Sequence, residues 1–320
     1  MPRSSTNPPP AQRRQRGIAL VTALLLVALA TTAAVEMVSR QHLDIRRVQN
    51  VLAYEQAYSY AVAAEQWALH QLQESFRHSP ERDHLAQDWA LPVILPEFDG
   101  ARLGMQIQDA QARFNVNNLA DVQPGDTDNI YLQQFLRLLE QQGADDPVAL
   151  ANAVMDWLDP DLEERPGGAE DSTYTQKERP YRAANQPIAD ISELRLVQGM
   201  TPELYRELEP HLSALPERTH ININTASAVL LRTIHPMDEP TAAHLVEQRP
   251  DEGFANVNEM LALIPGAGDS ISEQGMGVTS GHFQAAITVE LGPVRVQLLS
   301  LIRREQTGAL RVLARSQGAL

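Results

Sequence analysis

The sequence of 320 residues contains no cysteine. Disulfide scaffolds, cysteine-ligated zinc, iron–sulfur clusters and thiol nucleophiles are therefore excluded. Lysine is also scarce, because Lys177 is the only one, and 41 acidic residues against 26 basic ones leave a net charge of -15 at pH 7. A general nucleic-acid-binding protein needs a basic face to meet phosphate, so this composition argues against one. Hydrophobic residues still make up 43% of the chain, enough for most of it to fold around a core.

The sequence lacks the short motifs that mark common active sites. It contains no GxSxG, HExxH or P-loop pattern. Its nine histidines are scattered, and a scattered histidine is more often a surface or hydrogen-bonded core residue than a ligand. A membrane-anchored periplasmic enzyme would need a nucleophile or a metal triad, which is missing. We therefore expect no enzyme.

Proline is missing between Pro10 and Pro80, and Gly17 is the only glycine in that interval. Residues 1–17 carry four arginines and no acid, which leaves -19 on the remainder of the chain. Residues 18–35 read IALVTALLLVALATTAAV, without a charge. Eighteen helical residues span roughly 27 Å, just enough to cross the hydrocarbon core of a membrane. The positive-inside rule then predicts a cytoplasmic N-terminus and an exported body.

Apolar residues beyond Glu36 recur three and four positions apart, or at multiples of that spacing. The simplest structure is one helix from Ile18 to about His78, a rod of roughly 90 Å. A cleaved signal peptide is the alternative, with small residues from Ala30 to Ala34 near a cleavage site. Signal-peptide cleavage at that position would cut the predicted helix in its interior, so cleavage at Gly17 is favoured. The apolar positions in question are Val48, Val51, Leu52, Tyr58, Val62, Leu69, Leu72 and Phe76.

A short basic leader that ends in glycine, followed by an apolar helix running into a soluble domain, resembles the type IV prepilins and the type II secretion pseudopilins. The resemblance implies that a prepilin peptidase cuts after Gly17 and methylates the new amine of Ile18. Members of this family usually carry an acid at the fifth mature position. Here that position is Thr22.

Two stretches of strand-like sequence flank a long helical region. Residues 91–112 are typical of short strands with turns, and the alternation from Phe283 to Ile302, broken at Gly292-Pro293, predicts a β-hairpin. The residues from about Glu305 form either a final strand or a tail. This order predicts an α+β fold with an α-helical domain inserted between strands of a small antiparallel sheet; an all-helical chain and separate tandem domains are alternatives. Helix boundaries within 113–282 are signalled by Asp145 or Asp146, Asp190 and Thr201 as N-caps, by Pro202 in a first turn, and by Gly143 and Gly199 as stops.

Five blocks within the chain, in order and together with the leader, resemble the general secretion pathway protein K family, the large minor pseudopilins of type II secretion. The missing acid at the fifth mature position is itself usual for that pseudopilin. The blocks are RFNVNNLA at 113–120, DWLDPD at 156–161, PGGAEDSTY at 166–174, RPYRAANQPIADISELRLVQGMTPELY at 179–205 and ININTA at 221–226.

The resemblance suggests a division of the chain into six parts. Residues 1–17 are the leader, 18–36 the membrane part of the helix and 37–79 its periplasmic, amphipathic part. Residues 80–112 begin the αβ domain, and 283–320 close it with strands and a tail. The inserted domain covers 113–282, as a first half at 113–218 with an acidic loop and a helix-hairpin-helix-like, or SAM-like, half at 219–282.

The loop from Asp159 to Asp171 concentrates six carboxylates around a Gly167-Gly168 turn. Carboxylates at this density repel one another unless a cation lies among them, and a hard divalent ion with oxygen ligands and flexible coordination geometry, meaning calcium, fits best. A solvated acidic loop is the alternative, and the spacing is not that of an EF-hand. The resemblance implies calcium in the helical domain. The expected ligands are Asp159, Asp161, Glu170, Asp171 and, as a weaker candidate, Asn185.

The segment LALIPGAG at 261–268 resembles the turn of a helix-hairpin-helix unit, which can bind a DNA phosphate. Residues 222–282 contain eight acids against Arg232 and Arg249, and such a surface repels a duplex. We therefore expect a helix-hairpin-helix-like fold that does not bind nucleic acid.

The resemblance implies a subunit at the tip of the periplasmic pseudopilus that supports export of folded proteins across the outer membrane. It implies a single-pass protein of the bacterial inner membrane whose soluble domain is periplasmic. The implied partners are two other minor pseudopilins, of I and J type, and the prepilin peptidase; the outer-membrane secretin and exoprotein substrates are further candidates. A DNA-uptake or type IV pilus tip protein is the alternative, and it would need a basic groove.

Overall fold

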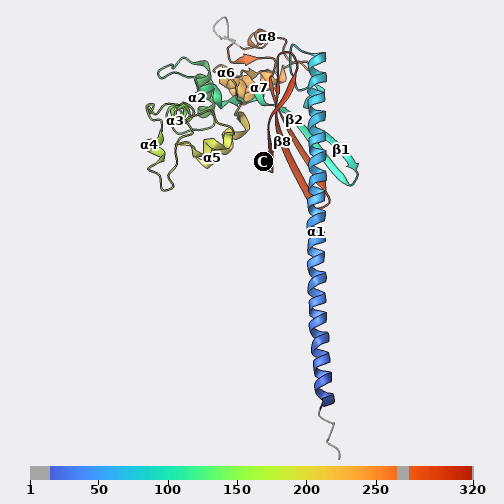
Figure 1. Cartoon of the computed structure of the whole chain (residues 1–320). Helices are drawn as coiled ribbons and strands as arrows, with labels where there is room; N and C mark the ends of the chain where they lie inside the picture. The colour runs from blue at the N-terminus through green and yellow to red at the C-terminus, as the bar shows by residue number, and fades with distance from the viewer. Residues whose placement is uncertain (1–14, 265–273, 319–320) are drawn as a thin grey trace, which may run out of the picture.

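The computed structural model describes residues 15–264 and 274–318, and its dominant feature is one helix. Helix α1 runs without a break over Gln15–His78, which confirms the rod that the sequence predicts (Figure 1). Every residue from Ile18 to Leu52 is exposed. This part contains an 18-residue window with a mean hydropathy of 2.5, so α1 is long and apolar enough to cross a membrane.

The last third of α1 lies across one face of a five-stranded antiparallel sheet. The strand order is β1-β2-β7-β8-β9, with bounds Val93–Phe98, Ala101–Asp109, His282–Leu291, Val294–Arg304 and Leu310–Gln317. Alanines at positions 57, 61, 64 and 68 face the sheet, and their small side chains let the helix approach it closely. They pack with strand residues such as Ile287 and Leu298 in one apolar core. Of the residues after Glu305, for which the sequence leaves two possibilities, Leu310–Gln317 form strand β9.

Strands β2 and β7 pair along their whole length, from Ala101 with Leu291 to Asp109 with Phe283. They are separated by more than 170 residues in the sequence, so the intervening chain leaves the sheet and returns at the same end. The predicted α+β fold, with an insert between strands, is therefore confirmed.

The insert builds a second apolar core of its own. Its helices begin and end largely where the sequence signals: Asp146 and Thr201 cap two of them, and Gly143 follows another with φ +78°. One expectation is corrected, because residues Ile191–Leu196 form a 3-10 helix rather than an α-helix. This six-residue segment is bounded by a capping box at Asp190, and short segments favour the tighter turn. The α-helices are α2 (Ile130–Gln141), α3 (Pro147–Leu158), α4 (Asp171–Tyr174), α5 (Pro202–Leu208), α6 (Ala228–Ile234), α7 (Glu239–Glu247) and α8 (Val257–Leu261).

Two short parallel ladders, which the sequence does not signal, also lie in the insert. They pair β3 with β4 and β5 with β6. Each strand is only two residues long and so carries no readable alternation. Their bounds are Phe114–Asn115, Leu212–Ser213, Ile221–Asn222 and Met276–Gly277.

A buried polar network joins the insert to the sheet. The Asp109 carboxylate accepts hydrogen bonds from the hydroxyls of Thr225 and Ser280, both at 2.6 Å, and from the Asn222 amide at 2.9 Å. Burial raises the pKa of Asp109, and these donors oppose that rise. Arg304 completes the junction by bonding the Asp83 carboxylate and the Ser280 carbonyl. Because buried polar groups need their partners, this network fixes how the insert sits on the sheet.

Candidate metal centre

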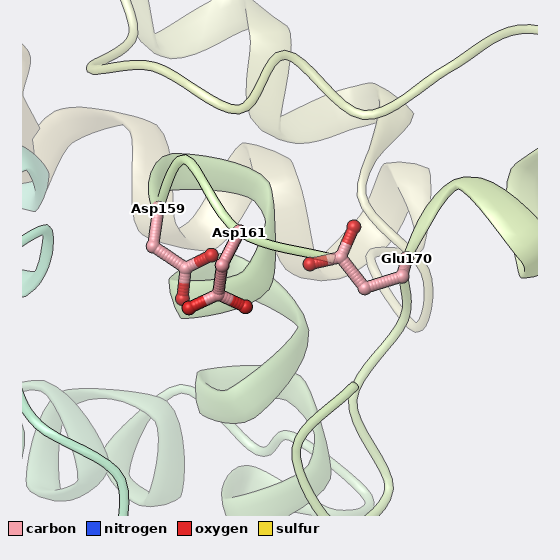
Figure 2. A group of neighbouring side chains, drawn as sticks. All are labelled: Asp159, Asp161 and Glu170. Atoms are coloured by element: carbon pink, nitrogen blue, oxygen red, sulfur yellow. The ribbon is translucent and has the colours of Figure 1, made fainter. Parts of the chain in front are cut away.

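Three carboxylates converge on the loop between α3 and α4. Asp159 follows the last residue of α3, Asp161 lies two residues further on, and Glu170 is the N-cap of α4. Figure 2 shows the Asp159 and Asp161 side chains next to each other, with Glu170 pointing toward them from the returning chain. One oxygen from each residue lies within 4.8 Å of the other two. That separation suits three ligands of one cation.

Two buried oxygen atoms of this group are not satisfied by the described part of the chain. Asp159 and Glu170 are buried, with 5% and 2% of their surfaces exposed, whereas Asp161 is exposed. Asp159 Oδ1 and Glu170 Oε1 find no hydrogen-bond partner within the described part of the chain. Buried acceptors without donors are costly, and a bound cation would satisfy them.

Asn185 contacts the backbone of one of these residues, Asp161. Its Nδ2 donates to the Asp161 carbonyl oxygen at 3.1 Å, and its backbone adopts the left-handed conformation, with φ +46°. Asn185 Oδ1 is buried and has no partner among the residues that the structure describes. An amide oxygen is a suitable calcium ligand, so Asn185 remains a candidate.

The Asp171 carboxylate makes its contacts outside the group of three carboxylates. Its Oδ1 accepts a hydrogen bond from the Ala183 backbone N–H at 2.9 Å, and Oδ2 lies 3.8 Å from the exposed Arg182 guanidinium. The structure therefore brings together Asp159, Asp161 and Glu170, places Asn185 against the Asp161 backbone, and leaves Asp171 outside the group.

Two residues that sequence reasoning missed organise the loop. Asp156 is fully buried and accepts hydrogen bonds from the backbone N–H groups of Arg165, at 3.2 Å, and Ala169, at 2.8 Å. The Arg165 side chain donates to Asp156 Oδ1 at 2.9 Å and also bonds Asp159 Oδ2. A lone arginine inside an otherwise acidic loop was the available signal. Gly168 is required here, because a Cβ at that position would lie 2.0 Å from Asp156 Oδ2.

The electrostatics of the group favour a cation. Burial raises the pKa of Glu170 to about 7, and the neighbouring carboxylates of Asp156, Asp159 and Asp161 add to this rise. Removing Glu170 from water thus disfavours its charged form, and a divalent ion would restore it. The candidate ligands are all oxygen atoms. This donor set fits calcium better than a transition metal.

The N-terminal part of the chain holds the other residues that the sequence singles out. Gly17 and Ile18 both lie within α1, and Ile18 is exposed. The Thr22 hydroxyl donates to the carbonyl oxygens of Ile18 and Ala19, both at 3.0 Å. Its hydrogen bonding is therefore satisfied by its own helix. The glycine-rich turn expected at 265–268 lies outside the described residues.

Comparison with known proteins places these features in one family. Models of the family described as type II secretion system (T2SS), protein K match residues 112–217 and 221–279. Type II secretion system protein K of Pseudomonas aeruginosa is 35% identical over 316 residues, covering 96% of this chain and 94% of that protein. The chain belongs to the type II secretion system protein K family. The protein K of Klebsiella pneumoniae is 34% identical over 306 residues, covering 91% and 93% of the two chains.

A solved structure agrees with this protein K assignment. One chain of the crystal structure of the GspK-GspI-GspJ complex from the enterotoxigenic Escherichia coli type 2 secretion system matches with a TM-score of 0.76 and 32% identity. The match covers 86% of this chain and 100% of the other. The predicted resemblance is therefore confirmed, and the protein is a minor pseudopilin of type II secretion.

Proposed function

We propose that this pseudopilin caps the tip of a periplasmic pseudopilus, where it assembles with I- and J-type pseudopilins and supports export of folded proteins across the outer membrane. Its role is structural rather than catalytic. The similar crystal structure of a GspK-GspI-GspJ complex supports the choice of partners. The observation that carries the tip position is the neutral, internally satisfied Thr22 near the start of α1.

Thr22 bears on whether another subunit lies above this one in the fibre. In related pilins, the acid at the fifth mature position pairs with the N-terminal amine of the neighbour above. An unpaired carboxylate in that apolar setting would cost several kcal/mol. A subunit with nothing above it has no amine to meet, so a hydroxyl that bonds its own helix is the less costly choice.

The insert supports the same position by its bulk. It leaves and re-enters the sheet at the end of the rod that lies away from the N-terminus (Figure 1). Another subunit stacked above this one in the fibre would clash with the insert. An end position avoids the collision.

The tip position is tested by counting labelled subunits on assembled fibres. We expect one label per fibre, at one end. Thr22→Glu should impair assembly and secretion, whereas Thr22→Ser, which keeps a neutral hydroxyl able to bond its own helix, should not. Labels spaced along the shaft, or full activity of the Thr22→Glu protein, would contradict the tip assignment.

We further propose that the protein matures by cleavage after Gly17 and methylation of Ile18 by a prepilin peptidase. The mature chain is then a single-pass inner-membrane protein, with its N-terminus at the cytoplasmic side and its soluble domain in the periplasm. Four arginines directly before an uncharged 18-residue run support this orientation.

The insert is proposed to bind calcium through Asp159, Asp161 and Glu170, with Asn185 as a further ligand. The unpartnered buried oxygens of Asp159, Glu170 and Asn185 support this site. Bound calcium would supply the positive charge that the carboxylates lack, and so hold α3 and α4 together. Exported calcium sites operate at about 10⁻⁴ to 10⁻³ M. At a hundred times its dissociation constant, a ligand adds about 2.7 kcal/mol of stability.

Thermal unfolding of the detergent-solubilised protein, with calcium and with chelator, tests the site. The midpoint should rise with calcium in the natural protein and stay unchanged in an Asp159→Asn Glu170→Gln double variant. Glu163→Gln, an exposed change in the same loop, is the control and should retain the rise. Equal midpoints for the natural protein in both conditions would rule the site out.

A further inference from the structure

A cavity of about 750 Å³ lies where the insert, the sheet and the end of α1 meet. Phe76 and Pro80 line one part of it, so it lies at the end of α1 away from the N-terminus (Figure 1). The rest of the lining comes from residues 217–220, from residues 279–282 where the chain returns to β7, and from residues 303–307 at the end of β8. Small-molecule sites of this size are mostly apolar, whereas this lining is largely polar.

His282, the first residue of β7, is a buried side chain without a partner at this cavity. Only 3% of its surface is exposed, and neither ring nitrogen has a hydrogen-bond partner within the described residues. Burial lowers the pKa of His282 despite the opposing charge of Glu217, so the ring is neutral at pH 7. A neutral imidazole offers one donor and one acceptor, and buried groups of this kind normally find partners.

Two arginines at the end of β8 bring positive charge to the cavity. The Arg304 guanidinium lies 4.9 Å from the ring centroids of both Phe76 and Phe283, which hold it in place. Its Nη1 is buried and has no partner in the part of the chain that the structure describes. Arg303 pairs with Glu217 of the insert at 2.8 Å, and both side chains are partly exposed. In total, three arginines and two glutamates line the cavity of a chain whose net charge is -15.

We infer that this cavity, here named the distal cleft, binds an acidic peptide segment of another protein, one carboxylate of which bonds His282, Arg303 and Arg304. The whole lining belongs to one chain, so binding in the distal cleft does not require the fibre position proposed above. A carboxylate would give the unpartnered Arg304 Nη1 and one nitrogen of His282 the acceptors that the protein does not supply.

The chemistry of the distal cleft favours a peptide over a small acid. Guanidinium groups bind carboxylates through short, charge-assisted hydrogen bonds. The second nitrogen of neutral His282 is an acceptor and suits a backbone N–H of the same segment, which a small free acid lacks. A doubly charged phosphate fits less well, because Glu217 and Glu305 offset part of the positive charge. The volume also exceeds what a single carboxylate fills.

The test measures binding of a dye-labelled peptide of alternating serine and glutamate to the detergent-solubilised protein. A peptide of alternating serine and glutamine is the control probe. We expect saturable binding of the glutamate peptide, tighter than that of the control by at least about tenfold. Absence of saturable binding, or equal binding of the two peptides, would overturn the assignment. Free glutarate that displaces the labelled peptide as well as the unlabelled peptide does would assign the distal cleft to a small acid instead.

Two ion pairs provide matched variants. Arg303 pairs with Glu217 at the distal cleft, and Arg295 lies 3.9 Å from Glu290 at the other end of β8. Arg303→Gln should weaken binding of the glutamate peptide about tenfold. Glu217→Gln should strengthen it about threefold, because a competing acid is removed. Arg295→Gln and Glu290→Gln should leave it unchanged. Equal effects at both pairs would show a general attraction of charge and overturn the distal cleft.

His282→Leu separates a binding role from a structural one. Because the buried imidazole has no partner among the described residues, an apolar side chain should leave the thermal midpoint unchanged or higher, yet weaken peptide binding about tenfold. His282→Gln, which keeps a donor and an acceptor, should retain binding. Unchanged binding by the His282→Leu protein, or an equal loss of binding in both variants, would remove His282 from the site and overturn the assignment.

Discussion

Arg165 and Asp156 form an ion pair in which both side chains are at least nine-tenths buried. The same guanidinium bonds Asp159, so one fixed positive charge compensates the innermost carboxylate and orients a candidate calcium ligand. Asp159 Oδ1 stays without a partner while Oδ2 is held. Such supporting contacts typically set the orientation of metal ligands.

Loss of Arg165 should therefore destabilise the folded protein strongly. Arg165→Met leaves Asp156 buried without its counter-charge, and we expect the free energy of unfolding to fall by about 3–5 kcal/mol. Arg182→Met is the control: its guanidinium is exposed and 3.8 Å from Asp171, so the change should cost less than about 1 kcal/mol. Denaturant titration in chelator measures both. A cost for Arg165→Met as small as that of the control would show that Asp156 is compensated in another way.

Glu170 should make the stability of the calcium-free protein depend on pH. Its folded pKa of about 7 lies above the ordinary value of 4.5, so its favourable contribution is complete below pH 4.5 and is lost as the pH rises through 7. In chelator, we expect the free energy of unfolding to decrease between pH 4.5 and pH 7 and the decrease to level off above pH 7. Glu170→Gln should flatten this decrease, and Glu163→Gln should not. A profile that is unchanged by Glu170→Gln would place the titration on another group.

The sequence predicts the long helix, the hairpin and the insert, because each depends on local periodicity or on punctuation by glycine and proline. It also predicts Asp159, Asp161 and Glu170 as a group. It could not show that Asp171 turns toward Ala183, since carboxylates dense in sequence converge only according to the path of the loop. The Asp156–Arg165 pair spans nine residues and depends on that same path.

Glu65 is a second case in which the sequence pattern could not predict a residue's contacts. It lies among the alanines that face the sheet and is fully buried, although the helical pattern alone gives no partner for it. The partners come from the other end of the chain: Arg315 on β9 donates to both carboxylate oxygens at 2.7 and 2.8 Å, and Ser300 on β8 donates as well. No local pattern connects residues 250 positions apart.

This cluster should hold β9 against α1. Burial would raise the pKa of Glu65, but the hydrogen bonds from Arg315 and Ser300 outweigh burial and lower it. Its contribution is therefore present above the ordinary pKa of 4.5 and is lost as the pH falls through the lower folded value. Arg315→Met should destabilise the protein by about 2–3 kcal/mol at pH 7, less than for a fully buried pair because Arg315 is 45% exposed.

Arg311→Met, an exposed change on the same strand, is the matched control. Thermal unfolding at pH 7 and at pH 4 measures both variants. The difference between them should shrink at the lower pH, where Glu65 begins to protonate. An equal effect of the two substitutions would mean that the Glu65 charge is not held by Arg315.

Maturation of the N-terminus should depend on Gly17 alone. A peptidase at the cytoplasmic face needs a small residue at the boundary between the basic leader and the apolar span, so Gly17→Val should leave the full-length precursor in the membrane. Ala33→Leu is the control: it removes a small residue from the only alternative cleavage region while keeping the span apolar. Mass spectrometry of the membrane-extracted natural protein and of Ala33→Leu should find a methylated N-terminus at Ile18 in both. A mature chain that begins near Ala33 would identify signal-peptidase cleavage instead, and normal processing of the Gly17→Val protein would remove Gly17 from the reaction.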